Sequence, residues 1–167
     1  MHINIRTARR LSALLAVPVL VLTGGPLSVA VAGTATVAPT LAPTQGDTGT
    51  VLNLVNEARA TAGCPALTVN SQLVQAAQAH SNDMAKTGNL SHTGSDGSSA
   101  GDRITKAGFK WSAYAENIAQ GYGSAKATFD GWMNSSGHKA NILNCTYKDT
   151  GIADTNGYWT QVFGTPQ

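Results

Sequence analysis

The feature of this sequence that most constrains its fold is an Asn-Gly pair between two β-rich runs near the end of the chain. Residues 150–154 and 158–163 flank Asn156 and Gly157, and this arrangement predicts a tight β-hairpin. Alternation puts Tyr158, Thr160 and Val162 on one face of the second strand, and Trp159, Gln161 and Phe163 on the other. Because both faces carry large apolar groups, we expect helices on both sides of the sheet.

Apolar residues recur at helical spacing in several earlier segments. The pattern predicts helices over 50–62, 70–87 and 124–133, one or two helical turns within 102–108, and a short helix that starts at Ser135 or Ser136 and holds His138. Asn70 is the expected cap of the second helix and Gly88 its stop. Residues 115–119 are a further strand candidate.

The chain begins with a secretory leader. Three arginines precede an apolar run over 11–22, and small residues then lead to Ala30-Val-Ala32. That order predicts a signal peptide over 1–32, with a mature chain that starts near Gly33 and is secreted. The pair Arg9-Arg10 leaves the twin-arginine route open beside the general pathway, which we favour. No other long apolar run follows, so we expect no membrane span after cleavage.

The charge balance changes when the leader is removed. Of the 11 basic residues three lie in the leader, which leaves 8 basic against 9 acidic residues. This balance gives no reason to expect nucleic acid as a partner. Residues 33–49 are rich in Ala, Thr, Pro and Gly, a composition typical of a flexible linker. One domain over 50–167 remains.

The two cysteines of the chain are Cys64 and Cys145. In an exported protein an even number of cysteines predicts a disulfide. Two buried free thiols are the alternative. A catalytic cysteine is disfavoured, because neither residue has a histidine within a few positions.

Charged residues are few, so polar residues within apolar segments stand out. His80 lies on the apolar stripe of the second predicted helix; a buried histidine bonded to a backbone group and a pocket-lining histidine are both open interpretations. His92 borders a glycine-rich loop and Glu116, one of two glutamates in the chain, lies in Ala-Glu-Asn-Ile-Ala. A carboxylate there is costly to bury unless it is paired. His138 starts a short helix, where the helix dipole favours a neutral ring.

Five segments of this chain together resemble secreted bacterial members of the CAP superfamily, which includes cysteine-rich secretory proteins, insect-venom allergens and plant pathogenesis-related proteins. The segments, which occur in the same order, are residues 77–85, 91–97, 115–119, 132–143 and 158–164. The resemblance spans nearly all of residues 50–164. It implies an α+β fold, an α-β-α sandwich in which a small, mostly antiparallel sheet lies between helical layers.

The resemblance also implies a set of cleft residues. Animal and plant members line a central cleft with two histidines and two glutamates. His92 and Glu116 match one of each, whereas Asn134-Ser135 and Tyr158 stand where the other glutamate and histidine are expected. His138 belongs to a bacterial variant of the motif, and we expect it to replace the missing histidine in space with Tyr158 nearby. His92, Glu116 and His138 then form at most a weak site for a divalent metal such as zinc.

Two functions remain open at this stage. The first is a non-catalytic extracellular binding module, a monomer whose polar cleft takes a lipid, a cell-wall glycan or a protein. The alternative is a secreted hydrolase or peptidase that uses Glu116 with His92 and His138, with or without a metal. A hydrolase needs an identifiable nucleophile or an intact ligand set, and the sequence marks neither, so we favour the binding module. Three Asn-x-Ser/Thr patterns leave glycosylation open.

Overall fold

The computed structural model describes residues 45–167. The predicted signal peptide and most of the predicted linker lie outside this range. The elements in chain order are α1 (Gln45–Thr61), β1 (Thr68–Val69), α2 (Ser71–Thr87), α3 (Ala100–Lys106), β2 (Trp111–Gln120), α4 (Ala125–Met133), α5 (Ser136–Ile142), β3 (Asp149–Thr155) and β4 (Tyr158–Pro166).

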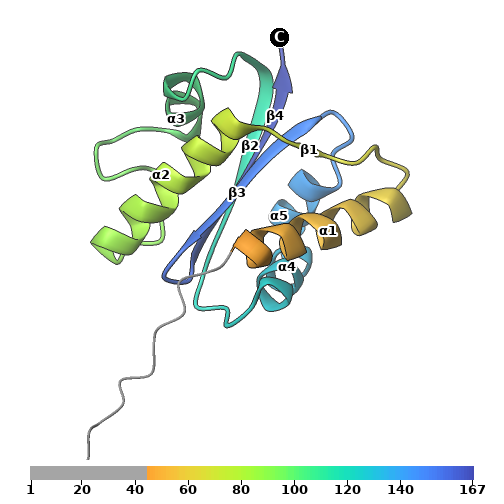
Figure 1. Ribbon diagram of the computed structural model, residues 1–167, viewed down its shortest axis with the longest axis horizontal. Helices are drawn as coiled ribbons and strands as arrows, with labels where there is room; N and C mark the ends of the chain where they lie inside the picture. Colours follow the sequence, from red (N-terminus) through yellow and green to blue (C-terminus); the bar gives the residue numbers. More distant parts are fainter. Residues whose placement is uncertain (1–44) are drawn as a thin grey trace, which may run out of the picture. The chain divides into compact units, whose positions relative to one another are not determined.

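The four strands form one mixed sheet in the order β1-β3-β4-β2 (Figure 1). The short β1 pairs parallel with β3, and the pairs β3–β4 and β4–β2 are antiparallel. β2 is therefore an edge strand. Its register places Glu116 opposite Val162 of β4.

The C-terminal hairpin forms as predicted. Asn156 and Gly157 have φ values of 52° and 80°, the left-handed conformation that a two-residue hairpin turn requires. Trp159 and Phe163 pack into one hydrophobic core, whereas Val162 packs into another. The alternation along β4 thus separates two cores, one on each face of the sheet.

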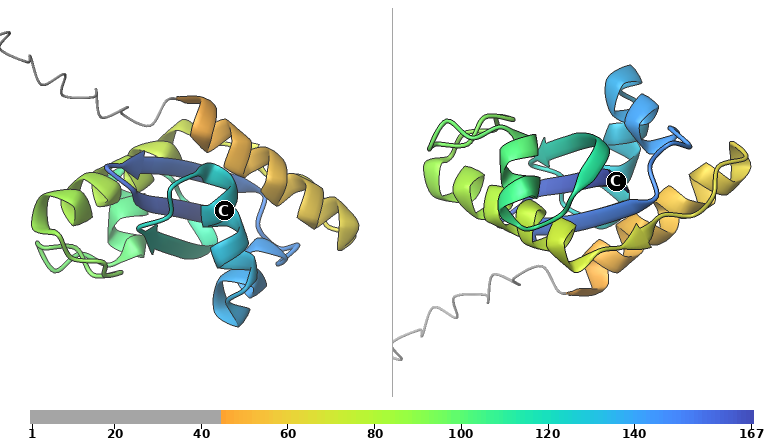
Figure 2. Two further views of the ribbon diagram at one scale, coloured as in Figure 1. Left: turned by 90° about the horizontal axis from the view of Figure 1, so that it is seen from below. Right: turned by 90° about the horizontal axis from the view of Figure 1, so that it is seen from above.

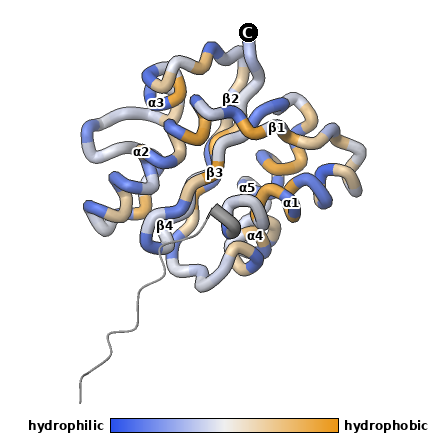
Figure 3. Tube along the Cα trace, in the orientation of Figure 1, coloured by the Kyte–Doolittle hydropathy of each residue, from blue (hydrophilic) through white to orange (hydrophobic). Residues whose placement is uncertain are grey.

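Helices cover both faces, which confirms the α-β-α sandwich. Figure 1 shows α2 and α3 on one side of the sheet and α1, α4 and α5 on the other, and the views in Figure 2 show the same layers. Hydrophobic and hydrophilic stretches alternate along α2 (Figure 3), because the hydrophobic residues face the sheet and the hydrophilic residues face the solvent. None of the helices within residues 45–167 has the length and apolar character needed to cross a bilayer.

Helix boundaries follow local capping rules. The side chain of Asn70 accepts hydrogen bonds at the start of α2, and Gly88 ends that helix in the left-handed conformation, as predicted. Helix α1 begins at Gln45 rather than at the expected cap Thr50. Asp47 lies in its first turn, where the positive end of the helix dipole stabilises a negative charge.

Gly151 lets α2 approach the sheet closely. A methyl group added at this position of β3 would overlap the backbone of Leu73 and Val74 in α2. Only a glycine therefore permits this contact between the helix and the sheet.

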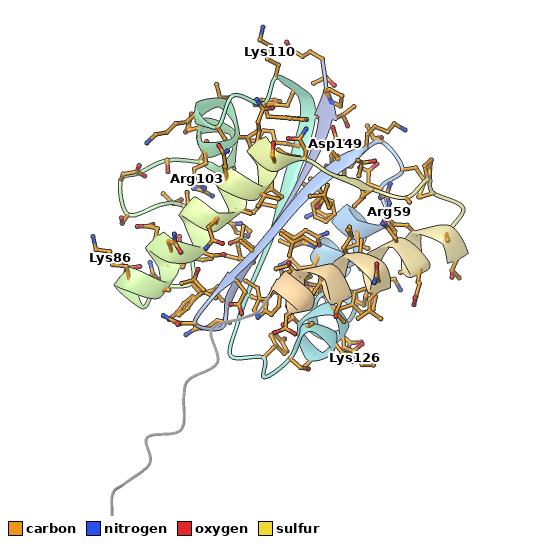
Figure 4. All side chains as sticks on the ribbon, viewed as in Figure 1. Arg59, Lys86, Arg103, Lys110, Lys126 and Asp149 are labelled. Carbon is orange, nitrogen blue, oxygen red and sulfur yellow. A yellow bond between two sulfur atoms is a disulfide. The ribbon has the colours of Figure 1, made fainter. Side chains whose placement is uncertain are left out.

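A buried arginine joins the end of α1 to a distant loop. Arg59, labelled in Figure 4, is fully buried and has its guanidinium surrounded by backbone carbonyls. It donates hydrogen bonds to the carbonyl oxygens of Pro65, Ile142, Asn144 and Tyr147 at 2.8–3.0 Å. Because these carbonyls satisfy the donors, the buried charge needs no carboxylate partner.

A disulfide lies beside this arginine. Cys64 and Cys145 are bonded, with their Cα atoms 4.9 Å apart, which confirms the predicted pair. The bond and Arg59 tie the same two segments together.

Candidate functional site

Glu116 lies at the centre of a charged group on the edge strand β2. Its side chain is only 3% exposed, and burial of an ionised carboxylate is unfavourable unless it is paired. Its oxygens are paired: Nη2 of Arg103 lies 2.8 Å from Oε2, and Nδ1 of His92 lies 2.8 Å from Oε1. Burial alone would raise the pKa of Glu116, but the hydrogen bond from His92 and the charge and hydrogen bond of Arg103 outweigh it and lower the pKa.

Arg103 comes from α3, whose start is fixed by a capping box of Ser99 and Asp102. The guanidinium, 8% exposed, donates to the carbonyl oxygens of Ser98 and His92 as well as to Glu116. It therefore holds the 91–99 loop against β2 (Figure 4 labels Arg103). The role of Arg103 was not predicted from the sequence. The capping box was the available signal, because it fixes where α3 starts and hence which residues of that helix point inward.

His80 approaches the same carboxylate from α2. It is fully buried, its Nε2 atom lies 2.8 Å from the carbonyl oxygen of Ser91, and Nε2 lies 3.8 Å from Oε1 of Glu116. Since a carbonyl only accepts, Nε2 is the donor. Burial, aided by the charge of Arg103, lowers the pKa of His80 despite the opposing charge of Glu116. This geometry confirms the interpretation of a buried histidine bonded to a backbone group.

His92 is the exposed member of the group. Its side chain is 58% exposed although Nδ1 contacts Glu116. The carboxylate accepts the hydrogen bond, so Nδ1 carries the proton and Nε2 keeps its lone pair in the neutral ring. Glu116 thus orients an imidazole that can accept a hydrogen bond or a proton.

His138 reaches this region from α5. Its carbonyl accepts a hydrogen bond from Nδ2 of Asn117, and Asn117 also accepts one from Asn141, which ties α5 to β2 next to Glu116. Burial lowers the pKa of His138, and the charge of His92 lowers it further. Among the described residues no hydrogen bond or ion pair joins the ring of His138 to His92 or Glu116, so its link to that pair is electrostatic only. We call His92, Glu116 and His138 the histidine–glutamate cluster.

Tyr158 does not join this cluster. It pairs with Gln120 at the far end of β2, and its hydroxyl accepts a hydrogen bond from Nε2 of Gln120 at 2.7 Å. Its ring packs against Met84. The register that sets Glu116 opposite Val162 leaves Tyr158 four residues away, about 13 Å along the strand.

The residues of the cluster do not fit a zinc ion. Within residues 45–167 no three histidine, cysteine or acidic side chains converge closely enough to hold a metal. The two oxygens of Glu116 already bond to His92 and to the guanidinium of Arg103, and that adjacent positive charge opposes a second cation.

A hollow of about 320 Å³ lies between α2 and α3. His80 and Arg103 are among its lining residues, whereas His92 and His138 are not. The exposed ring of His92 is therefore not part of the lining of this hollow.

Comparison with known proteins gives consistent matches to one family. Residues 52–163 match the family described as "Cysteine-rich secretory protein family", or CAP. Two proteins of Bacillus subtilis, the uncharacterized membrane protein YlbC and the uncharacterized protein YkwD, are 32% and 31% identical over 113 and 115 residues. These alignments cover 68% of this chain but only 33% and 45% of the two relatives, so the chain spans less than half the length of either.

Solved structures agree on the fold. An extracellular protein of Bacillus anthracis that contains an SCP domain is 29% identical, with a TM-score of 0.69 over 71% of this chain and 40% of that protein. An outer surface protein of Borrelia burgdorferi has the same TM-score at 20% identity, over 75% of this chain and 96% of its own. At that lower identity the likeness is one of fold.

Proposed function

This chain belongs to the cysteine-rich secretory protein (CAP) family, and from that premise we propose that it is an extracellular binding protein whose ligand contacts the histidine–glutamate cluster. The observation that carries the proposal is the pairing of Nδ1 of His92 with the buried carboxylate of Glu116 at 2.8 Å. A ring that is both exposed and oriented loses little conformational freedom when a ligand binds to it.

The chemistry of the cluster favours a polar ligand. When its ring is neutral, His92 accepts a hydrogen bond at Nε2, and burial lowers the pKa of His138. Two neutral imidazoles offer acceptors to hydroxyl or amide N–H donors. A glycan or a peptide supplies such donors, whereas the tail of a lipid does not.

An extracellular location rests on two supports. The leader over residues 1–32 is typical of an exported chain. The related Bacillus anthracis protein is described as extracellular. The relative YlbC is described as a membrane protein, and it is about three times as long as the segment that matches this chain.

The second candidate function is hydrolysis with His92 as the base. A carboxylate that orients an imidazole through Nδ1 is an arrangement that hydrolases use, and this pair provides it. Glu116 itself is a poor base, because its pKa is lowered and both oxygens are engaged. Within residues 45–167 the ring of His92 bonds to Glu116 and to no serine hydroxyl, which favours binding over hydrolysis.

The test compares the secreted protein with His92→Ala, His138→Ala and, as a control, Lys139→Ala, an exposed neighbour of His138. Each is applied to an array of soluble glycans and to a peptide library, and the same library is assayed for cleavage. We expect ligands that the two histidine variants lose and the control retains. Equal binding by all four proteins would remove the cluster from the site, and cleavage that depends on His92 would establish the hydrolase.

A further inference from the structure

His92 is held by its backbone as well as by its ring. His80 donates from Nε2 to the carbonyl oxygen of Ser91 at 2.8 Å, and Arg103 donates from Nη2 to the carbonyl oxygen of His92 at 2.9 Å. These carbonyls belong to the two peptide units that flank the α-carbon of His92. Both donor side chains are buried, and a hydrogen bond is stronger in such surroundings than in water. The direction in which the side chain of His92 leaves the backbone is therefore fixed from inside the protein.

Arg103 also fixes the carboxylate that bonds to this ring. Its Nη2 atom lies 2.8 Å from Oε2 of Glu116, which leaves Oε1 for Nδ1 of His92, also at 2.8 Å. Its Nη1 atom donates to the carbonyl oxygen of Ser98 at 2.9 Å. One guanidinium thus joins the carboxylate, the backbone of His92 and the far end of the 91–99 loop. A lysine has a single nitrogen and no planar fork, so it cannot bond to all of these acceptors in the same way.

The ring of His92 is sensitive to this arrangement, because its exposed atom changes character with the tautomer. A proton on Nδ1 leaves Nε2 as an acceptor, whereas a proton on Nε2 makes that atom a donor. An ionised carboxylate favours the first form, since a protonated carboxyl group can itself donate to Nδ1. Burial raises the pKa of Glu116, but the hydrogen bond from His92 and the charge and hydrogen bond of Arg103 outweigh it and lower the pKa. Arg103 thus helps to keep the partner of Nδ1 an acceptor.

We infer that Arg103 is the positioning residue that determines which ligands the histidine–glutamate cluster accepts. Because it fixes both Glu116 and the backbone of His92, it holds the ring in the tautomer that presents Nε2 as a hydrogen-bond acceptor. The cluster then selects ligand groups that donate, such as hydroxyl and amide N–H groups, over groups that only accept. The inference about ligands rests on the function proposed above, but the state of the ring can be measured without any ligand.

The first test reads the protonation of the His92 ring nitrogens by ¹⁵N NMR of the secreted protein at pH 8, above the ordinary pKa of an imidazole. The signals are assigned by their loss in His92→Ala. We expect a proton on Nδ1 and none on Nε2 in the parent. Arg103→Gln should give a mixture of both tautomers, because neither the carboxylate nor the loop is then held. Arg103→Lys keeps the charge without the fork and should give a smaller fraction of the second tautomer.

Lys106→Gln is the matched control. It removes an exposed positive charge from the same helix and should leave the ring of His92 unchanged. A parent ring that carries its proton on Nε2 would overturn the inference without any variant. An unchanged tautomer in either folded Arg103 variant would overturn it as well, since Arg103 would then only stabilise the fold. If Arg103→Gln does not fold, the parent and Arg103→Lys decide.

The second test uses the glycan array and the peptide library with the same proteins. Glycans and peptides whose binding depends on His92 should bind Arg103→Lys about tenfold more weakly than the parent, and Lys106→Gln as tightly as the parent. O-methylated forms of those glycans accept hydrogen bonds but donate none from their former hydroxyls, and they should bind the parent more weakly. Equal binding in either comparison would overturn the role of Arg103 in specificity. If no ligand depends on His92, the function proposed for the cluster fails, and the NMR result still decides whether Arg103 sets the tautomer.

Discussion

Nη2 of Arg103 lies 2.8 Å from Oε2 of Glu116, and the two side chains are 8% and 3% exposed. This ion pair links α3 to the edge strand β2. Removal of Arg103 leaves the buried carboxylate with only its hydrogen bond to His92, and the loss of one partner from a buried ion pair costs about 3–5 kcal/mol in comparable pairs. We expect Arg103→Met to lower the free energy of unfolding by that amount in urea titrations.

The same pair offers an internal control. In Arg103→Met the unfavourable group is the ionised Glu116, so the added change Glu116→Gln should restore part of the lost stability. Lys126→Ala removes an exposed pair with Asp130, whose side chains are 70% and 46% exposed, and should change the midpoint little. If Arg103→Met unfolds at the urea concentration of the parent, the pair does not stabilise the fold.

The prediction for the core concerns Trp132 in α4. Its side chain is 1% exposed, and its Nε1 donates to the carbonyl oxygen of Ile118 at 3.1 Å. Truncation of a buried aromatic side chain costs about 3–5 kcal/mol, so Trp132→Ala should lower the melting temperature strongly. Phe129, which is only partly buried on the same helix, is the matched comparison, and Phe129→Ala should cost less. Calorimetry that ranks the two variants in the reverse order would contradict the packing.

The disulfide prediction concerns stability rather than activity. Cys64 and Cys145 are 81 residues apart in sequence, and removal of a bond that closes a long loop typically costs about 2–4 kcal/mol. The double variant Cys64→Ser/Cys145→Ser should therefore melt at a lower temperature. Mass spectrometry of the unreduced secreted protein should find no free thiol, and alkylation of either cysteine would refute the bond in the secreted protein.

Stability should fall as the solution becomes acidic. The pKa values of His80 and His138 are lowered in the folded protein, above all by burial, whereas the unfolded chain binds those protons near pH 6.5. The unfolded state then carries more protons below that pH, and the free energy of unfolding decreases. The lowered pKa of Glu116 acts in the same direction at lower pH. Urea midpoints between pH 8 and 5 measure this, and His138→Asn should flatten the dependence; a midpoint that rises with acidity would contradict the assignment.

The prediction of export is tested by the position of the N-terminus in the mature protein. The leader predicts cleavage after Ala32, so mass spectrometry of protein from the culture medium should find an N-terminus within a few residues of Gly33. Secreted material that retains Met1 would exclude the signal peptide.

Local signals made much of the fold predictable. Asn156-Gly157 specifies a turn with two left-handed residues, and the residues on both faces of 158–163 required a covered sheet. Asn70 and Gly88 mark the ends of α2 because their side-chain or backbone chemistry acts within one turn. Such features depend on neighbours in sequence, and the structure confirms them.

Contacts between distant segments were not predictable in this way. The two-residue β1 exists only because it pairs with β3, and Arg59 and Arg103 acquire their roles from carbonyls and a carboxylate elsewhere in the chain. The prediction that Tyr158 lies near Glu116 was wrong, because the β2–β4 register separates the two residues. Polar residue types indicated Glu116, His92 and His138, but not that Arg103 would bond to the side chain of Glu116 and to the carbonyl of His92.

The cage around Arg59 has a consequence for when the domain can fold. Its carbonyl partners extend to Tyr147, 88 residues further along the chain, and β1 must wait for β3, which starts at Asp149. Burial of Arg59 without these carbonyls would be unfavourable. Helix α1 therefore cannot pack in its final position until the segment that supplies them is present. Folding dominated by such remote contacts is slow. The domain therefore cannot close around Arg59 before its last third is available to supply these partners.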